Sequence, residues 1–231
     1  MMGTPDRRAS RRRLRLKRLI DVCGAAAGLV ILAPVVAWVA VAAAVIQGPP
    51  ILFRQMRPGL DGRPFTIFKF RTMRAPVGNE VWYLTDEERL TRLGRFLRST
   101  SLDELPELWN VLRGDMSLVG PRPLLMEYLD EYTPDERRRH GVRPGITGWA
   151  AVNGRNTLRF GERLELDVWY VDHWSLGLDL RILAMTVKQV LRRANATATE
   201  DLSLGFPLPG AGDQAAESPG RSTASESTSA T

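Results

Sequence analysis

A chain of 231 residues, 44% of them hydrophobic, is long enough for one compact domain with appendages. This composition is that of a globular protein and excludes a polytopic membrane protein. The net charge of +6 is concentrated at the start, where residues 1–18 hold eight Lys and Arg against Asp6 alone. A basic arm of this kind suits an anionic partner, either nucleic acid or acidic lipid.

The segment after the arm decides between these two partners. No charged residue occurs from Val22 to Ile46, and a run of this length suits a helix embedded in a bilayer. Because the run lies directly against the arm, we expect anionic membrane lipids as the partner and no nucleic acid. The single cysteine, Cys23, lies within the run, so no internal disulfide can form, in agreement with a reducing cytosolic side.

The apolar run either crosses the membrane or enters and returns. Pro34 lies near its middle, where it removes a helix hydrogen bond and kinks the axis. Residues 54–74 are basic like the arm, and a simple span would place one basic flank outside, against the positive-inside tendency. A kinked helix that exits on its entry side satisfies both flanks. The residues alone leave a single span with a proline kink as an equal alternative.

The remainder of the chain predicts a small β element among helices. Residues 51–55 and 65–70 are typical of short strands, and the Pro-Gly and Asp-Gly pairs between them predict a hairpin turn. Thr85 with Glu88 forms a capping-box pattern that predicts the start of a helix through Leu97.

Further along, the pattern predicts mainly helices. Ser101 with Glu104 forms a second capping-box pattern, and Gly114 is expected to end the helix that follows. Residues 143–149 are typical of a loop. Further helices are expected near 123–132, from Pro134, near 161–174 and near 178–193.

The predicted fold class is therefore α+β, mostly helical. The expected organisation is a basic arm at 1–18, a membrane helix at 19–48 broken near Pro34, a catalytic domain at 49–195, and a disordered tail at 205–231 that is rich in Gly, Pro, Ser and Thr.

The chemistry must depend on carboxylates and arginines, because the sequence has no P-loop, no GxGxxG and no His/Cys cluster of metal-binding type. The strongest candidates are Asp103 and Glu104, which we expect in the first turn of a helix. The helix dipole there favours anions, so it keeps a carboxylate ionised for service as a nucleophile or a metal ligand. In the alternative interpretation Glu104 only caps the helix by reaching back to Ser101.

Several arginines favour a phosphate-bearing substrate. Arg122 lies between two prolines and Arg143 precedes a Pro-Gly pair, so both are expected on stiff turns. Arginine on a rigid turn suits bidentate phosphate recognition, because little side-chain entropy is lost on binding. The residues alone thus indicate a membrane-associated domain that handles phosphate.

From about Lys17 to Ala194 the sequence resembles the monotopic phosphoglycosyl transferases, also called the bacterial sugar transferase family. The resemblance is specific, because several long motifs occur in the family's order. They are KRLID at 17–21, FKFRTM at 68–73, LRSTSLDELP at 97–106, GDMSLVGPRP at 114–123, RPGITG at 143–148 and DVWY at 167–170. One departure is Ala33-Pro34, where the small members look like Ser-Pro.

The resemblance implies a re-entrant membrane helix and a catalytic domain on the cytosolic face of the cytoplasmic membrane. It implies transfer of a sugar phosphate from a UDP-sugar to polyprenyl (undecaprenyl) phosphate with release of UMP, as the first step of glycan assembly such as exopolysaccharide biosynthesis. In this scheme Asp103 attacks the sugar-bearing phosphorus and carries the phosphosugar until the lipid phosphate removes it, a ping-pong mechanism.

The resemblance also implies roles for single residues. Asp103 and Glu104 would hold Mg²⁺ together with the diphosphate. Lys69, Arg98, Arg122 and Arg143 match motif positions and would bind substrate phosphates. Asp167 and Tyr170 also match a motif, with a role in substrate binding or in structure.

Two other functions remain open on the sequence. One is a membrane-tethered phosphohydrolase, in which water replaces the lipid phosphate. The other is a non-catalytic scaffold of a polysaccharide-assembly complex. The sequence predicts neither the sugar nor the oligomeric state.

Overall fold

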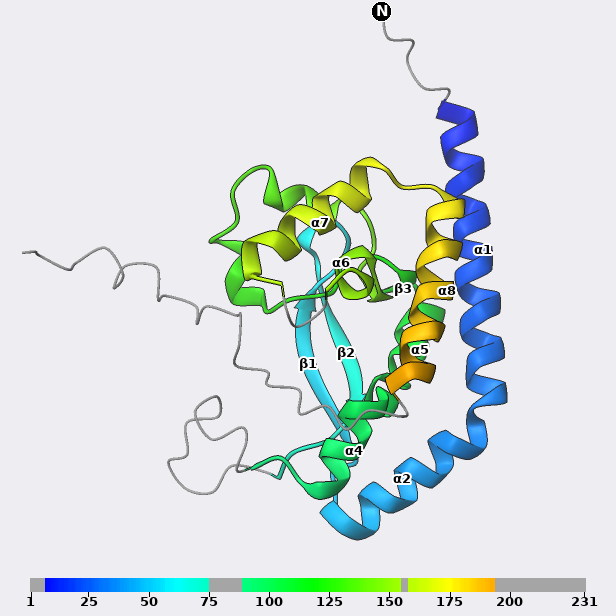
Figure 1. Cartoon of the computed structure of the whole chain (residues 1–231), viewed down its shortest axis with the longest axis vertical. Helices are drawn as coiled ribbons and strands as arrows, with labels where there is room; N and C mark the ends of the chain where they lie inside the picture. Colours follow the sequence, from blue (N-terminus) through cyan, green and yellow to red (C-terminus); the bar gives the residue numbers. More distant parts are fainter. Residues whose placement is uncertain (1–6, 75–88, 155–157, 194–231) are drawn as a thin grey trace, which may run out of the picture.

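A computed structural model describes residues 7–74, 89–154 and 158–193 of the chain (Figure 1). Its helices are α1 (Arg7–Ile31), α2 (Ala33–Gln47), α4 (Arg92–Thr100), α5 (Glu107–Arg113), α6 (Trp149–Val152), α7 (Phe160–Asp172) and α8 (Leu176–Arg193). The strands are β1 (Leu52–Pro58), β2 (Pro64–Phe70), β3 (Ser117–Val119) and β4 (Gly145–Thr147). The mostly helical α+β class predicted from the sequence is confirmed.

The N-terminal helix is broken where the proline predicts it. Helices α1 and α2 meet at Leu32 with a bend of 62°. Pro34 lies in the first turn of α2, where its missing N–H group costs no hydrogen bond. Among the described residues, no helix by itself has the length and apolarity to cross a membrane, and only this bent pair together satisfies both requirements. Helix α1 begins at Arg7, so the basic arm from that residue onward is part of the same helix.

Helix α1 packs closely on α5 and β3. Two glycines one turn apart make this possible: a Cβ added to Gly24 would lie 2.7 Å from Leu118 Cδ1, and one added to Gly28 would lie 3.3 Å from Leu108 Cδ1. Ala25 between them is fully buried. In Figure 1 this helix runs along one side of the molecule, next to α8. The first part of the apolar run is therefore anchored to the domain.

Helix α2 has one face on the domain and one face free. Val39 is fully buried and packs in one cluster with Phe70 of β2 and Leu97 of α4. The opposite side exposes 57% of Trp38 and 80% of Val45. Such an apolar exposed face requires a partner other than water.

The predicted hairpin is confirmed and is longer than expected. Strands β1 and β2 pair antiparallel from Leu52 opposite Phe70 to Pro58 opposite Pro64. The turn contains η1 (Leu60–Gly62), with Asp61 and Gly62 at positive φ, as the Asp-Gly pair predicts. Strand β2 then leads toward α4.

The prediction of a loop at 143–149 is wrong, because residues 145–147 form β4. This strand pairs in parallel with β3, and each has only three residues. Strands this short carry no readable alternation, so the pattern could not reveal them. The pairing is tight: a Cβ on Gly145 would lie 2.1 Å from the backbone nitrogen of Gly120.

The prediction that Ser101 and Glu104 form a capping box at the start of a helix is also wrong. Ser101 adopts a left-handed conformation, with φ 57°, and its side chain makes no capping hydrogen bond. Asp103 and Glu104 lie in a 3₁₀ turn, η2 (Leu102–Glu104), between α4 and α5, and not in the first turn of an α-helix. A helix dipole therefore does not explain their charge state, which depends on side-chain partners described below.

Two more predicted helices are shorter and tighter than expected. The segments near 123–132 and after Pro134 contain the 3₁₀ turns η3 (Met126–Leu129) and η4 (Glu136–Gly141). Gly114 does end α5, at φ 92°, as predicted. The capping-box pattern at 85–88 and the tail at 205–231 lie outside the described residues.

We predict that Gly94→Ala destabilises the fold although alanine favours helices by about 1 kcal/mol. Its Cβ would lie 1.9 Å from the carbonyl oxygen of Thr72, which accepts a hydrogen bond from Thr91. Forcing this backbone apart should cost about 1–3 kcal/mol of unfolding free energy, measured by thermal unfolding. Gly161→Ala in α7 is the control, because nothing lies within 4 Å of its added Cβ. Equal midpoints for the two variants would contradict this packing.

Candidate active site

Four separate segments bring the predicted site residues together. Lys69 lies on β2, Arg98 on the last turn of α4, and Arg122 on the loop after β3. Asp103 and Glu104 come from the turn η2 between them. Glu104 therefore meets cations that are 18 and 35 residues away in sequence.

One oxygen of Glu104 binds two cations. Lys69 donates to Oε1 at 2.9 Å, and Arg122 Nη2 donates to the same atom at 2.6 Å. Burial alone would raise the pKa of Glu104, but Arg122 and Lys69 hold it down to about 2. Glu104 is therefore a fixed anion that orders both cations.

Asp103 has a different environment. Asp103 is 9% exposed, and among the described residues its carboxylate accepts no hydrogen bond. Burial and the neighbouring charge of Glu104 raise its pKa to about 6, opposed by Lys69, Arg122 and Arg98. The group is ionised at neutral pH, and no residue that the structure describes binds its carboxylate, which are the properties of a nucleophile.

Arg98 is held in place near Asp103. Its Nε donates to Thr72 Oγ1 at 3.1 Å, just beyond β2. Thr72 in turn belongs to the segment that passes closely over Gly94 of α4. The close approach of this backbone to α4 therefore determines where Arg98 lies.

Sequence analysis missed Glu107, which lies three residues after Glu104. Its Oε1 lies 3.0 Å from Lys69 Nζ, and only 3% of its side chain is exposed. Burial raises its pKa to about 7, against the opposing effect of Lys69. Lys69 thus lies between two carboxylates. The i, i+3 spacing of the two glutamates was the available signal.

Asn110 was missed as well, and it fixes the geometry of the site. Its side-chain amide pairs with the free edge of β2, accepting from Phe68 N at 3.1 Å and donating to Thr66 O at 2.7 Å. The residue is fully buried. It locks α5 to the strand that carries Lys69, so the lysine and Glu107 meet.

Asp167 supports the site indirectly, through Arg139. It forms a buried ion pair with Arg139, at 2.5 Å between Nη2 and Oδ2. The same Nη2 donates to the backbone carbonyl of Arg122 at 2.7 Å. Of the two roles that the motif allowed for Asp167, the contacts support the structural one.

Tyr170 and Arg143 are not brought to the carboxylates. Tyr170 is 1% exposed and donates to Asp179 at 2.7 Å. Arg143 donates through Nε to the carbonyl of Gly114 at 2.8 Å, at the C-terminal end of α5, whereas Asp103 precedes the start of that helix. Its assignment to substrate phosphate has no support in these contacts.

The acidic residues of the site could bind Mg²⁺ only together with a substrate phosphate. Among the described residues, no group of three or more His, Cys, Asp and Glu side chains is arranged around a common point. Mg²⁺ usually needs only one or two carboxylates together with substrate phosphates and water. Within the described part of the chain, the carboxylate of Asp103 accepts no hydrogen bond, and the ion pairs of Glu104 use Oε1. These residues fit a cation shared with a diphosphate, and not a cage made by the protein alone.

The chain was then compared with known proteins. Residues 12–193 match the model of a family described as bacterial sugar transferase. The chain belongs to the bacterial sugar transferase family. It is an enzyme of the phosphoglycosyl transferase class, as the sequence motifs predicted.

Curated relatives of different lengths share the matched region. The chain is 52% identical to the sugar transferase EpsL of Bacillus subtilis (strain 168), covering 76% of this chain and 87% of the relative. It is 43% identical to the UDP-glucose:undecaprenyl-phosphate glucose-1-phosphate transferase of Caulobacter vibrioides, covering 78% and 71%. A protein of the same name in Escherichia coli (strain K12) is 40% identical, but only 39% of its length is covered.

We predict that the stability of the Glu107→Gln variant relative to the wild type increases as the pH rises. In the unfolded chain Glu107 loses its proton near pH 4.5, whereas the folded enzyme retains it to about pH 7. The native enzyme therefore loses stability across this window, and glutamine does not titrate. The melting temperature of the variant relative to the wild type should be higher at pH 8 than at pH 4.5.

The matched control is Glu165→Gln, which changes an exposed residue of α7. The pH dependence of the Glu107→Gln difference is measured against that of this variant. A Glu107→Gln difference with no greater pH dependence would contradict the burial argument.

Proposed function

We propose that this enzyme transfers a sugar phosphate from a UDP-sugar to undecaprenyl phosphate through a covalent intermediate on Asp103. The observation that carries the proposal is the buried carboxylate of Asp103, which no described residue binds although three cations lie near it. The printed names of the relatives from Caulobacter vibrioides and Escherichia coli support the two substrates, because they describe UDP-glucose as donor and undecaprenyl phosphate as acceptor.

In the first half-reaction an oxygen of Asp103 attacks the sugar-bearing phosphorus of the donor. A bond forms between that oxygen and phosphorus, the bond to the bridging diphosphate oxygen breaks, and UMP leaves with the electron pair. Lys69, Arg98 and Arg122 lie close enough to Asp103 to lower its pKa, so they would stabilise negative charge that accumulates there in the transition state.

In the second half-reaction a phosphate oxygen of the lipid acceptor attacks the same phosphorus. The bond to Asp103 breaks, the carboxylate is regenerated, and the product is a polyprenyl diphosphate sugar. Because UMP leaves before the acceptor reacts, the two half-reactions form a ping-pong cycle. Mg²⁺ held by Asp103 and Glu104 with the diphosphate would supply further neutralisation of charge.

The three carboxylates of the site differ in their suitability as nucleophile. Glu104 is bound by two cations through one oxygen, and Glu107 is buried against Lys69. Only Asp103 combines ionisation at neutral pH with a carboxylate that no described residue binds. The contacts therefore favour the aspartate.

We further propose that α1 and α2 form a re-entrant membrane helix, with the catalytic domain on the cytosolic face. The bend exposes 75% of Val30 and 73% of Ile31 at its apex, where water would be an unfavourable neighbour. Arg71 donates to the carbonyls of Gln47 and Gly48 at 2.5 and 2.6 Å, which satisfies the end of α2 where it leaves the lipid.

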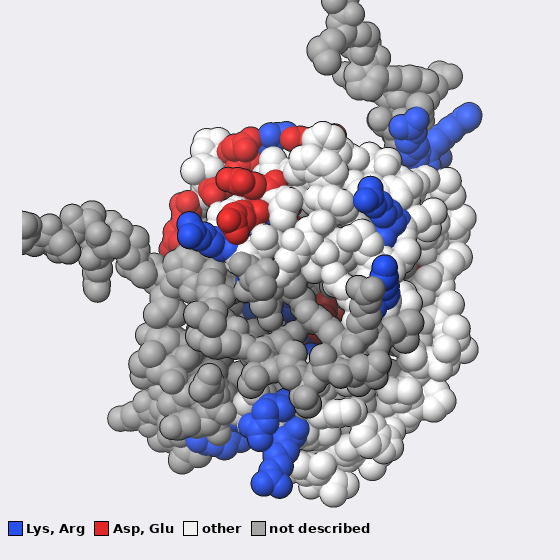
Figure 2. Space-filling view, in the orientation of Figure 1, with Lys and Arg blue, Asp and Glu red and all other residues white. Residues whose placement is uncertain are grey.

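The charge distribution agrees with this orientation. Figure 2 shows acidic residues gathered around α7, whereas basic residues lie at the start of α1, along α8 and beside α4. Helix α4 exposes Arg92 and Arg95 next to Phe96, which is 46% exposed. An aromatic residue flanked by arginines suits the headgroup region of an anionic membrane.

We predict that Asp103→Asn abolishes UMP release and covalent labelling together. An amide cannot act as the anionic nucleophile, so incubation with a UDP-sugar labelled in the sugar should leave no radioactivity on the protein. Asp130→Asn, an exposed aspartate, is the control and should behave as the wild type.

The acceptor requirement separates transfer from hydrolysis. Without undecaprenyl phosphate, the wild type should release at most one UMP per enzyme, and with it turnover should continue. UMP release over many turnovers that ignores the lipid would favour a phosphohydrolase. Full function of Asp103→Asn in glycan assembly would favour a scaffold.

The topology predicts that both flanks of the membrane helix face the same side. In a Cys23→Ala background, Arg12→Cys and Arg63→Cys should react equally with an impermeant maleimide in inside-out vesicles, and neither should react in sealed cells. Both positions are exposed in the structure. Labelling of the two cysteines from opposite sides would show a simple span.

A further inference from the structure

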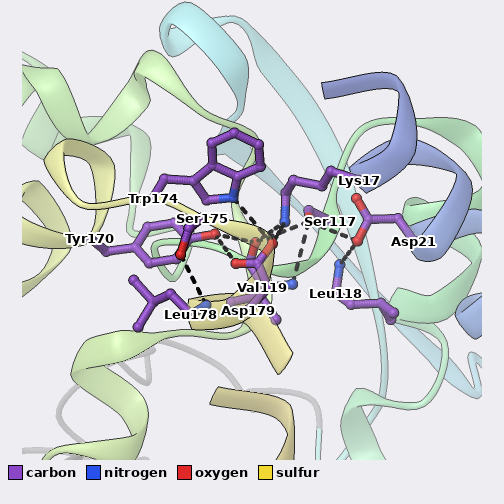
Figure 3. Close-up of polar contacts among 10 residues, drawn as sticks. All are labelled: Lys17, Asp21, Ser117, Leu118, Val119, Tyr170, Trp174, Ser175, Leu178 and Asp179. Carbon is purple, nitrogen blue, oxygen red and sulfur yellow. Dashed lines mark hydrogen bonds and ion pairs between the residues drawn. The ribbon is translucent and has the colours of Figure 1, made fainter. Parts of the chain in front are cut away.

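Asp179 in the first turn of α8 binds side chains from three segments. Lys17 of α1 lies 2.7 Å from its Oδ2, Tyr170 of α7 donates to Oδ1 at 2.7 Å, and Trp174 donates to Oδ2 at 3.2 Å (Figure 3). Only 12% of the lysine side chain and 9% of the aspartate side chain are exposed. Removing one partner of such a shielded pair leaves an uncompensated charge.

The same side chains hold the backbone of β3. The carbonyl of Val119 accepts from Lys17 at 3.1 Å, from Tyr170 at 3.2 Å and from Ser117 Oγ at 2.9 Å. One turn after Lys17, Asp21 accepts from the backbone nitrogen of Leu118 at 3.0 Å (Figure 3). Helix α1 therefore forms hydrogen bonds with two consecutive residues of β3, Leu118 and Val119.

The end of β3 is only three residues from Arg122. Gly120 donates to Thr147 O at 2.9 Å, and the carbonyl of Pro121 accepts from Gly145 at 3.0 Å, so the intervening backbone is bound at each residue. Proline also fixes its own φ. On the far side, Arg139 holds the carbonyl of Arg122. The carbonyl of Val119 and the backbone of Arg122 therefore belong to one continuous, hydrogen-bonded segment.

We propose that Lys17 is a positioning residue that couples the seating of membrane helix α1 to the placement of the Arg122 guanidinium on Glu104. It acts through Asp179, Tyr170 and the carbonyl of Val119. The inference deepens the proposed function, on which it rests for the role of Arg122 at the donor phosphates. Catalysis then requires that α1 is docked on the domain, so an enzyme detached from its membrane helix has a misplaced phosphate-binding arginine.

Lys17 differs in this respect from the basic residues before it. Arg12, Arg13 and Arg15 are exposed and available to lipid headgroups. The ammonium group of Lys17 already has two protein partners. Its charge serves the interior contact.

The test is a double-mutant cycle on the full chain in nanodiscs that contain anionic lipid. Lys17→Met, Arg122→Gln and the double variant are compared with the wild type by initial rates of UMP release with undecaprenyl phosphate present. Lys17→Met should lower kcat/KM for the UDP-sugar by about tenfold to 100-fold, as misplacement of a binding group does. In the Arg122→Gln background it should change kcat/KM by less than about twofold.

A general loss of folding would reduce both backgrounds equally, so equal losses would overturn the proposal. An unchanged kcat/KM for Lys17→Met would also overturn it. Lys188→Met, an exposed lysine of α8, is the matched control and should leave the rate unchanged.

If Lys17→Met does not fold, Tyr170→Phe replaces it in the cycle, because it removes only the hydroxyl that binds Asp179 and Val119. The same non-additivity with Arg122→Gln is expected, and additive losses would refute the coupling. Absence of UMP release by the wild type with every UDP-sugar would contradict the proposed function itself, and the coupling with it.

Discussion

Two cations share one carboxylate oxygen of this enzyme, and that contact keeps Glu104 charged beside Asp103. Because Lys69 and Arg122 both bind Oε1 of Glu104, the glutamate stays ionised and occupied. Asp103, next to it in the chain, feels the same cations without binding them, at least among the described residues. Adjacent carboxylates with pKa values moved in opposite directions are a common basis for separate chemical roles.

The rest of the fold holds the ion pairs of Glu104 with Lys69 and Arg122 in place. Asn110 ties α5 to the free edge of β2, which brings Lys69 to the glutamates. Arg139 holds the carbonyl of Arg122, and Lys17 and Tyr170, both bound to Asp179, hold the carbonyl of Val119. Lys17 belongs to α1, so the helix proposed to enter the membrane is also part of the framework of the active site. An enzyme with one soluble and one lipid substrate would gain from this arrangement, because the site is organised where both can arrive.

Sequence reasoning succeeded where the signal was local. The Asp-Gly turn, the break near Pro34 and the stop at Gly114 each follow from the backbone preferences of one or two residues. It failed where tertiary contacts decide: residues 102–104 form a 3₁₀ turn because α4 ends in a left-handed Ser101, and the two three-residue strands exist only through their pairing.

The same distinction holds for the site. Lys69, Arg98, Asp103, Glu104 and Arg122, which the motifs singled out, lie near one another in the structure, and their roles stay predictions. Asn110 and Arg139 act through contacts across the fold that no spacing reveals, and Arg143 binds the far end of α5.

The central claim is that UMP leaves before the acceptor reacts, and isotope exchange tests it most directly. With no acceptor present, labelled UMP should exchange into UDP-glucose or UDP-galactose, and Asp103→Asn should prevent it. Exchange that requires undecaprenyl phosphate would contradict a covalent intermediate on Asp103.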